Sequence, residues 1–178
     1  MTRFLIATLF VLSACSANKM EHQMDQSQAF PTLKAQTLAG NNITFPEDIM
    51  GKKSFIAMVF EDMGAYMKPQ NQANAWANAY EQYLKPEGVV FYEIPMMASA
   101  FGMMRGWVDN GMRSGIPSEK HDNIACFYGD KGKYKKALSI GSYKEAHIFI
   151  LDETGNILFY EHGGPTDEGI QRMKEVLL

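Results

Sequence analysis

Cysteine is scarce in this sequence: only Cys15 and Cys126 occur among 178 residues. They stand far apart, so the chain lacks the Cys-x-x-Cys pair of dithiol redox centres. If Cys15 is modified, Cys126 has no partner for an internal disulfide. Excess positive charge is also lacking, because 17 Lys and Arg stand against 20 Asp and Glu, a net charge of −3. This balance predicts no nucleic-acid partner.

A long hydrophobic run is the third absence. The apolar run covers only residues 4–11, with Thr8 inside it, whereas a membrane-spanning helix needs roughly 20 apolar residues. Arg3 precedes this run and the small residues Ser13 and Ala14 follow it, which is the layout of a secretory signal peptide. The segment LSAC at positions 12–15 resembles the lipobox of bacterial lipoproteins. The resemblance implies that Cys15 is acylated and becomes the mature N-terminus; otherwise the segment is an ordinary signal peptide.

The chain is predicted to have three parts. Residues 1–14 form the signal peptide, residues 15–29 carry the lipidated Cys15 and a polar, flexible tether, and residues 30–178 form one domain. The protein would then be lipid-anchored in the bacterial cell envelope and face the periplasm. Ser16, rather than Asp, follows Cys15 and favours the outer over the inner membrane. A mildly acidic body leaves membrane attachment to the acyl chains.

Strands and helices are expected to alternate along the domain. A turn at 40–42 joins a hairpin of residues 33–38 and 43–45, and the apolar runs 54–60 and 89–94 are typical of buried strands. A right-handed crossover makes those two strands parallel. The further elements are helices over 69–84, 97–108 and 131–138, a loop or broken helix over 109–123, strands over 125–128, 146–151 and 156–160, and a last helix capped by Thr166.

The phrases FPTLKAQTLAG, GKKSFIAMVF and HIFILDETGNILF resemble the thioredoxin-like fold over residues 30–178. The resemblance implies an α/β domain with a central mixed sheet, an N-terminal hairpin and helices on both faces. That family places a reactive cysteine after the first buried strand and a proline before the later hairpin. Residues 61–69 contain no cysteine and residues 143–146 no proline. These departures favour a protein that is not an enzyme. A peroxiredoxin-like or thiol oxidoreductase stays open as the second alternative and would depend on Cys126.

A narrower resemblance is to the mitochondrial ATP synthase assembly factors of the thioredoxin-like class, which lack Cys-x-x-Cys. It is carried by FP at 30–31, a helix containing Trp76, YEIP at 92–95 and MRSGIP at 112–117. The lipid anchor and the apolar pair at 159–160 depart from that family. The resemblance implies a non-redox binding, assembly or chaperone role for a membrane complex, with an envelope or membrane protein as partner. The candidate partner-binding residues are Trp107, Arg113, Ile116, Pro117 and His121. Alternatively, this segment is a solvated connector.

The first alternative function is a periplasmic Cu(I) chaperone. Sco-type copper chaperones resemble this chain in fold, and they carry Cys-x-x-x-Cys where this chain has Met63 and Met67. Thioether and imidazole ligands suit Cu(I), so Met63, Met67 and His147 are the candidate metal ligands. Residues four apart share one face of a helix, which would direct both sulfur atoms to one side. Methionine also fills irregular cores, and apart from copper no cofactor is expected.

Overall fold

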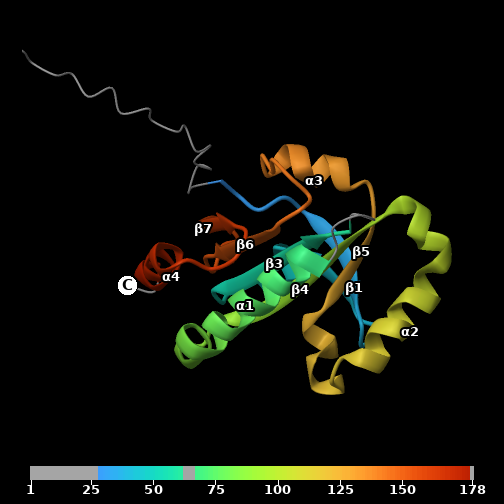
Figure 1. Ribbon diagram of the computed structural model, residues 1–178, viewed down its shortest axis with the longest axis horizontal. Coiled ribbons are helices and arrows are strands. Elements are labelled where there is room, and N and C mark those ends of the chain that lie inside the picture. The colour runs from blue at the N-terminus through green and yellow to red at the C-terminus, as the bar shows by residue number, and fades with distance from the viewer. Residues whose placement is uncertain (1–27, 62–66, 177–178) are drawn as a thin grey trace, which may run out of the picture.

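The computed structural model describes residues 28–61 and 67–176 (Figure 1). The predicted signal peptide, Cys15 and Met63 lie outside these residues. Seven described strands form one mixed sheet in the order β2-β1-β5-β4-β3-β6-β7. The predicted thioredoxin-like α/β fold is confirmed.

The described elements follow each other along the chain in the expected alternation. The strands are β1 (Leu33–Thr37), β2 (Asn42–Phe45), β3 (Ser54–Phe60), β4 (Val90–Ala98), β5 (Ala125–Gly129), β6 (Ala146–Leu151) and β7 (Ile157–His162). The helices are α1 (Met67–Tyr83), α2 (Arg105–Gly115), α3 (Lys131–Ala137) and α4 (Asp167–Glu175). Short 3-10 helices are η1 (Glu47–Ile49), η2 (Lys85–Glu87), η3 (Ser99–Met104) and η4 (Ser118–Asn123). Among the described helices, none is long and apolar enough to cross a bilayer.

Strand β3 is buried along its whole length because it lies in the middle of the sheet between β4 and β6. It runs parallel to β4, as the crossover rule predicts, and antiparallel to β6. Its alternate residues contribute to two apolar layers. Phe55 and Val59 pack in a layer with Trp76 of α1, whereas Ile56 and Phe60 belong to the layer on the opposite face.

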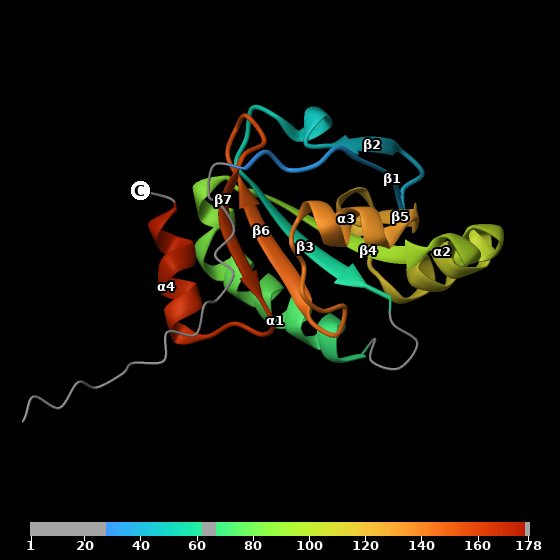
Figure 2. The ribbon, with the colours of Figure 1, turned by 90° about the horizontal axis from the view of Figure 1, so that it is seen from above.

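The helices cover both faces of the sheet. Residues of α1 and α4 pack into one apolar layer, and residues of α3 pack into the other. Figure 2, seen from above, shows α3 on the near side of the sheet, α1 on the far side and α2 at the right-hand edge. Helix α2 packs through Met112 over Cys126 of β5.

The segment after β4 differs from its prediction. The sequence indicates a strand ending at residue 94, a helix over 97–108 and a loop or broken helix over 109–123, but β4 continues to Ala98 and a regular helix begins at Arg105. Met96 and Met97 are buried in β4, where they pair with Phe127 and Tyr128 of β5. This pairing with a strand thirty residues away overrides the local helical pattern.

Candidate functional site

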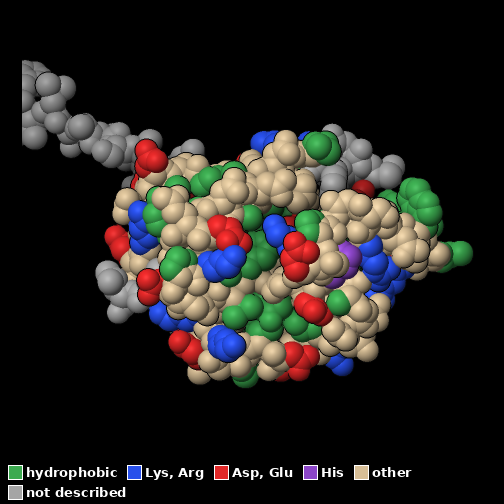
Figure 3. Space-filling view, turned by 90° about the horizontal axis from the view of Figure 1, so that it is seen from below, with side chains coloured by type: hydrophobic (Ala, Val, Ile, Leu, Met, Phe, Trp, Pro, Cys, Tyr) green, Lys and Arg blue, Asp and Glu red, His purple; other side chains and the backbone are tan. Residues whose placement is uncertain are grey.

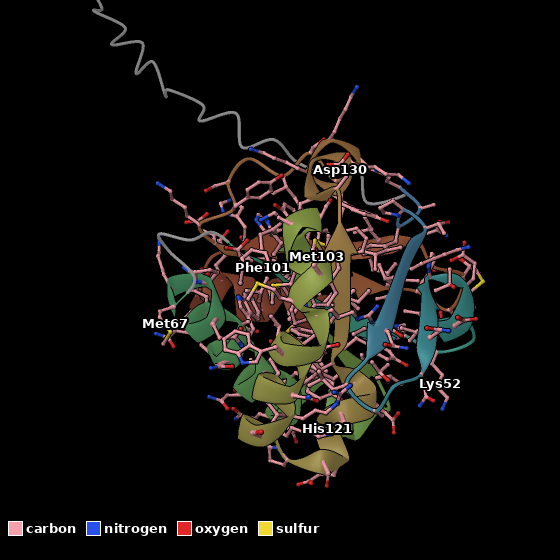
Figure 4. The ribbon with its side chains drawn as sticks, turned by 90° about the vertical axis from the view of Figure 1, so that its right-hand side faces the viewer. Lys52, Met67, Phe101, Met103, His121 and Asp130 are labelled. Carbon is pink, nitrogen blue, oxygen red and sulfur yellow. The ribbon has the colours of Figure 1, made fainter. Side chains whose placement is uncertain are left out.

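Three large apolar side chains are exposed together on η3 and α2. Met103 is 99% exposed, Trp107 is 76% exposed and Met104 is 50% exposed. Side chains three or four positions apart lie on the same side of a helix, so we call this set the α2 ridge. Figure 3 shows hydrophobic side chains protruding at the right-hand edge, and Figure 4 shows Phe101 and Met103 on the face toward the viewer. Clustered exposed apolar side chains mark interaction surfaces.

The opposite side of α2 is fixed to the sheet by a buried polar cluster. The Asp109 carboxylate is 4% exposed and accepts a hydrogen bond of 2.6 Å from the Tyr128 hydroxyl. Arg105 Nε donates to the same carboxylate at 3.3 Å, and Arg105 Nη2 donates to Gln36 Oε1 at 2.8 Å. Burial and the Asp109 carboxylate raise the pKa of Tyr128. These contacts join α2 to β1 and β5, which holds the α2 ridge outward in one orientation.

Of the five predicted partner-binding residues, Trp107 and Pro117 are exposed. The other three make internal contacts. Arg113 Nε donates to the Leu38 carbonyl at 2.6 Å, and His121 Nε2 lies 2.9 Å from the carbonyl of Ile116, whose side chain is half-buried. These three residues hold the connection between α2 and η4 against the end of β1. Because Arg113, Ile116 and His121 make internal contacts, Trp107 is the predicted residue that offers a partner a large exposed apolar surface.

The interpretation of the sequence did not assign Met103 and Met104 to the partner-binding surface. Met103 is the more exposed of the two. Their spacing of four and three residues from Trp107 is the signal that would have placed all three on one helical face.

Cys126 has the opposite of the environment that a reactive thiol needs. Its side chain is 1% exposed in β5, and burial, together with the Asp109 carboxylate, raises its pKa to about 12. A nucleophilic cysteine requires a lowered pKa and access to its substrate. The structure therefore gives Cys126 the role of a small buried hydrophobic residue and does not support a thiol oxidoreductase.

The described part of the corner after β3, where thioredoxin-like enzymes carry their thiols, is occupied by a partly buried ion pair. Lys131 Nζ donates to the Glu61 carbonyl and lies 3.3 Å from the Glu61 carboxylate, and both side chains are about 15% exposed or less. The Tyr143 ring stacks on Phe60 at 4.7 Å between centroids, and Lys131 and Lys135 lie over it at 5.2 Å and 4.8 Å. These side chains offer neither a thiol nor another activated nucleophile.

The candidate copper ligands are not brought together in the described residues. His147 is 1% exposed; its Nε2 lies 2.7 Å from the Ser142 carbonyl and its Nδ1 lies 3.0 Å from the Tyr160 hydroxyl. Both ring nitrogens therefore have a hydrogen-bond partner. Met67 is 68% exposed at the first turn of α1, and Met63 lies outside the described residues. The described residues contain no group of three or more His, Cys, Asp and Glu that could hold a metal ion. The copper site stays a prediction.

The fold defines a thioredoxin-like domain. The thioredoxin domain of a thiol-disulfide oxidoreductase from Bacteroides vulgatus is similar, with a TM-score of 0.57 and 16% identity over 87% of this chain and 99% of that one. The exposed lipoprotein thioredoxin Etrx1 of Streptococcus pneumoniae has a TM-score of 0.53 and 14% identity over 82% of this chain and 98% of its own. BsSco, of the Sco family of cytochrome c oxidase assembly proteins, has a TM-score of 0.56 and 13% identity over 88% and 98%. Identities this low show the fold alone.

A sequence profile of the family described as ATP10 protein matches residues 14–177. The chain therefore belongs to the ATP10 family, a family of ATP synthase assembly factors, which confirms the narrower resemblance. No curated protein matches the sequence.

Proposed function

We propose that this chain is a membrane-anchored, non-redox assembly factor of the bacterial cell envelope. It binds an apolar segment of a membrane-complex subunit through the α2 ridge and keeps that segment from aggregating until the complex forms. Membership of the ATP10 family supports an assembly role. The acylated Cys15 holds the domain at the periplasmic side of the membrane that contains the partner complex.

One observation supports the α2 ridge as the partner-binding surface. Trp107 and Met103 expose most of their side chains although the buried cluster beneath α2 could have fixed a polar outer face equally well. A tryptophan buries about 150–250 Å² when a partner covers it. Exposed aromatic anchors of this kind are the residues whose truncation costs about 2 kcal/mol or more of binding, which is about a 30-fold loss of affinity.

The test compares two exposed positions in the intact chain. Trp107→Ala should lower the yield of the crosslink between the tagged chain and its membrane partner by about 30-fold, when the chain is present at limiting concentration. Met50→Ala is the matched control, because Met50 is also 51% exposed but lies beside η1, away from α2. Equal crosslinking by both variants, with unchanged far-UV circular dichroism, would refute the assignment of the ridge.

The family also names a complex to measure. In cells lacking the chain, we expect less assembled ATP synthase on native gels, restored by the wild type and by Met50→Ala but not by Trp107→Ala. If ATP synthase is unchanged while another membrane complex is depleted, the assembly role stands and the partner belongs to that other complex. If every membrane complex assembles normally, the proposed function is wrong.

A further inference from the structure

Positive charge is concentrated on one short helix although the whole chain is mildly acidic. Helix α3 has the sequence KGKYKKA and carries four lysines in seven residues. Tyr134 is buried beneath the helix, and the exposed Lys133 and Lys136 occupy the outer side. Lys131 and Lys135 flank them and are half-buried over the Tyr143 ring. Two acidic residues of the described part lie next to the helix: Asp130, whose side chain caps Gly132 N, and Glu61, which pairs with Lys131, so neither is paired with Lys133 or Lys136.

The chain enters the described domain beside this helix. Gln28 Nε2 donates to the Ala137 carbonyl at the end of α3 at 2.8 Å, and the Gln28 carbonyl accepts from Ile157 N at 2.9 Å. Figure 1 shows the described chain starting on the side of the sheet that carries α3. From Cys15 to Gln28 the chain can span at most about 45 Å. An anchor at Cys15 therefore keeps Gln28, and the end of α3 beside it, within about 45 Å of the membrane surface.

We propose that the lysine face of α3 binds the anionic phospholipid headgroups of the membrane that holds the Cys15 anchor. The proposal rests on the anchor in the proposed function and adds the orientation of the domain. Each lysine near an anionic membrane surface raises the affinity for that surface about fivefold, so Lys133 and Lys136 together raise it about 25-fold. Two lysines alone would bind the membrane weakly, but the tether to Cys15 keeps Lys133 and Lys136 close to its surface.

This orientation places the α2 ridge at the side of the domain. In Figure 4 Asp130, which caps α3, lies near the top of the molecule, His121 lies at the bottom, and Met103 lies between them on the face toward the viewer. With α3 on the lipid, the ridge faces along the membrane plane rather than away from it. A membrane-embedded partner would reach it from that direction.

The test is an amine-labelling footprint of the full chain, recovered from cells and reconstituted in lipid vesicles. In vesicles of phosphatidylglycerol and phosphatidylcholine, acetylation of Lys133 and Lys136 should be about fivefold slower or more than in pure phosphatidylcholine. Lys85 is the internal control, because it is exposed on η2 and should react equally in both. About 1 M salt reduces the Debye length to about 3 Å and should abolish the protection.

Other outcomes separate the alternatives. Equal labelling of Lys133 and Lys136 in both vesicles overturns the proposal. Protection by inorganic phosphate in neutral vesicles overturns it too, since the face would then bind free phosphate rather than lipid. Mass spectrometry of the same sample reports whether Cys15 is acylated. If Cys15 is not acylated, the anchor of the proposed function is wrong. The labelling is then repeated with excess lipid in about 10 mM salt. Absence of protection of Lys133 and Lys136 under those conditions still refutes lipid binding by α3.

Discussion

His147 should make the stability of the domain depend on pH. A carbonyl can only accept, so Nε2 carries the proton donated to Ser142, and Nδ1 accepts from the Tyr160 hydroxyl. Burial lowers the pKa of His147 from its ordinary value of 6.5 to about 4. The folded domain therefore holds the ring neutral at a pH where the unfolded chain protonates it. This favours the unfolded state as the pH falls through 6.5.

The sign and the window follow from those two values. Above pH 6.5 both states hold a neutral ring and the stabilisation is complete; it declines as the pH falls to about 4 and is constant below that. The full loss is about 3 kcal/mol at 1.36 kcal/mol per unit of pKa, of which about 2 kcal/mol falls between pH 7 and pH 5. Most carboxylates titrate below pH 5, and Glu93, whose pKa is raised by burial, contributes equally to the wild type and to His147→Gln.

The assay is urea-induced unfolding at pH 7, 6 and 5, followed by the fluorescence of the buried Trp76. His147→Gln removes the titrating ring, so its free energy of unfolding should fall by about 2 kcal/mol less than that of the wild type over this window. His121→Gln controls for loss of an imidazole elsewhere. Parallel pH profiles for the wild type and His147→Gln would refute a neutral, buried ring.

Two further predictions concern the region beneath α2. Tyr128→Phe should lower the free energy of unfolding by about 1.5–3 kcal/mol, because it removes a 2.6 Å hydrogen bond to the buried Asp109 carboxylate; an unchanged urea midpoint would contradict the role of this bond. The Cys126 thiol, with its pKa raised to about 12, should resist iodoacetamide at pH 8 in the folded protein and react in denaturing urea. Rapid alkylation of the folded protein would reopen the thiol oxidoreductase alternative.

Much of the fold could be read from local patterns. The run 54–60 became β3 and the run 146–151 became β6, with the bounds that their apolar residues suggest. Thr166 caps α4 as predicted, since its hydroxyl accepts from Gly169 N at 3.0 Å. These signals are strong because the residues that determine them are neighbours in the chain.

The candidate site was less predictable. The extension of β4 to Ala98 depends on its pairing with β5, and this shift moves the helix that presents Trp107. Arg113 has a guanidinium that suits a partner, but its contact with the Leu38 carbonyl, 75 residues away, exists only in the folded chain.

The sequence by itself determined the α/β class, the absence of a Cys-x-x-Cys pair and the resemblance to the family, because composition, periodicity and short motifs can be read directly from the chain. Only the tertiary structure decided which side chains face outward. Met96 and Met103 are seven residues apart and chemically identical, yet one is fully buried and the other is 99% exposed. The physical reason is that burial depends on the strands and helices that pack over a residue, and those come from distant parts of the chain.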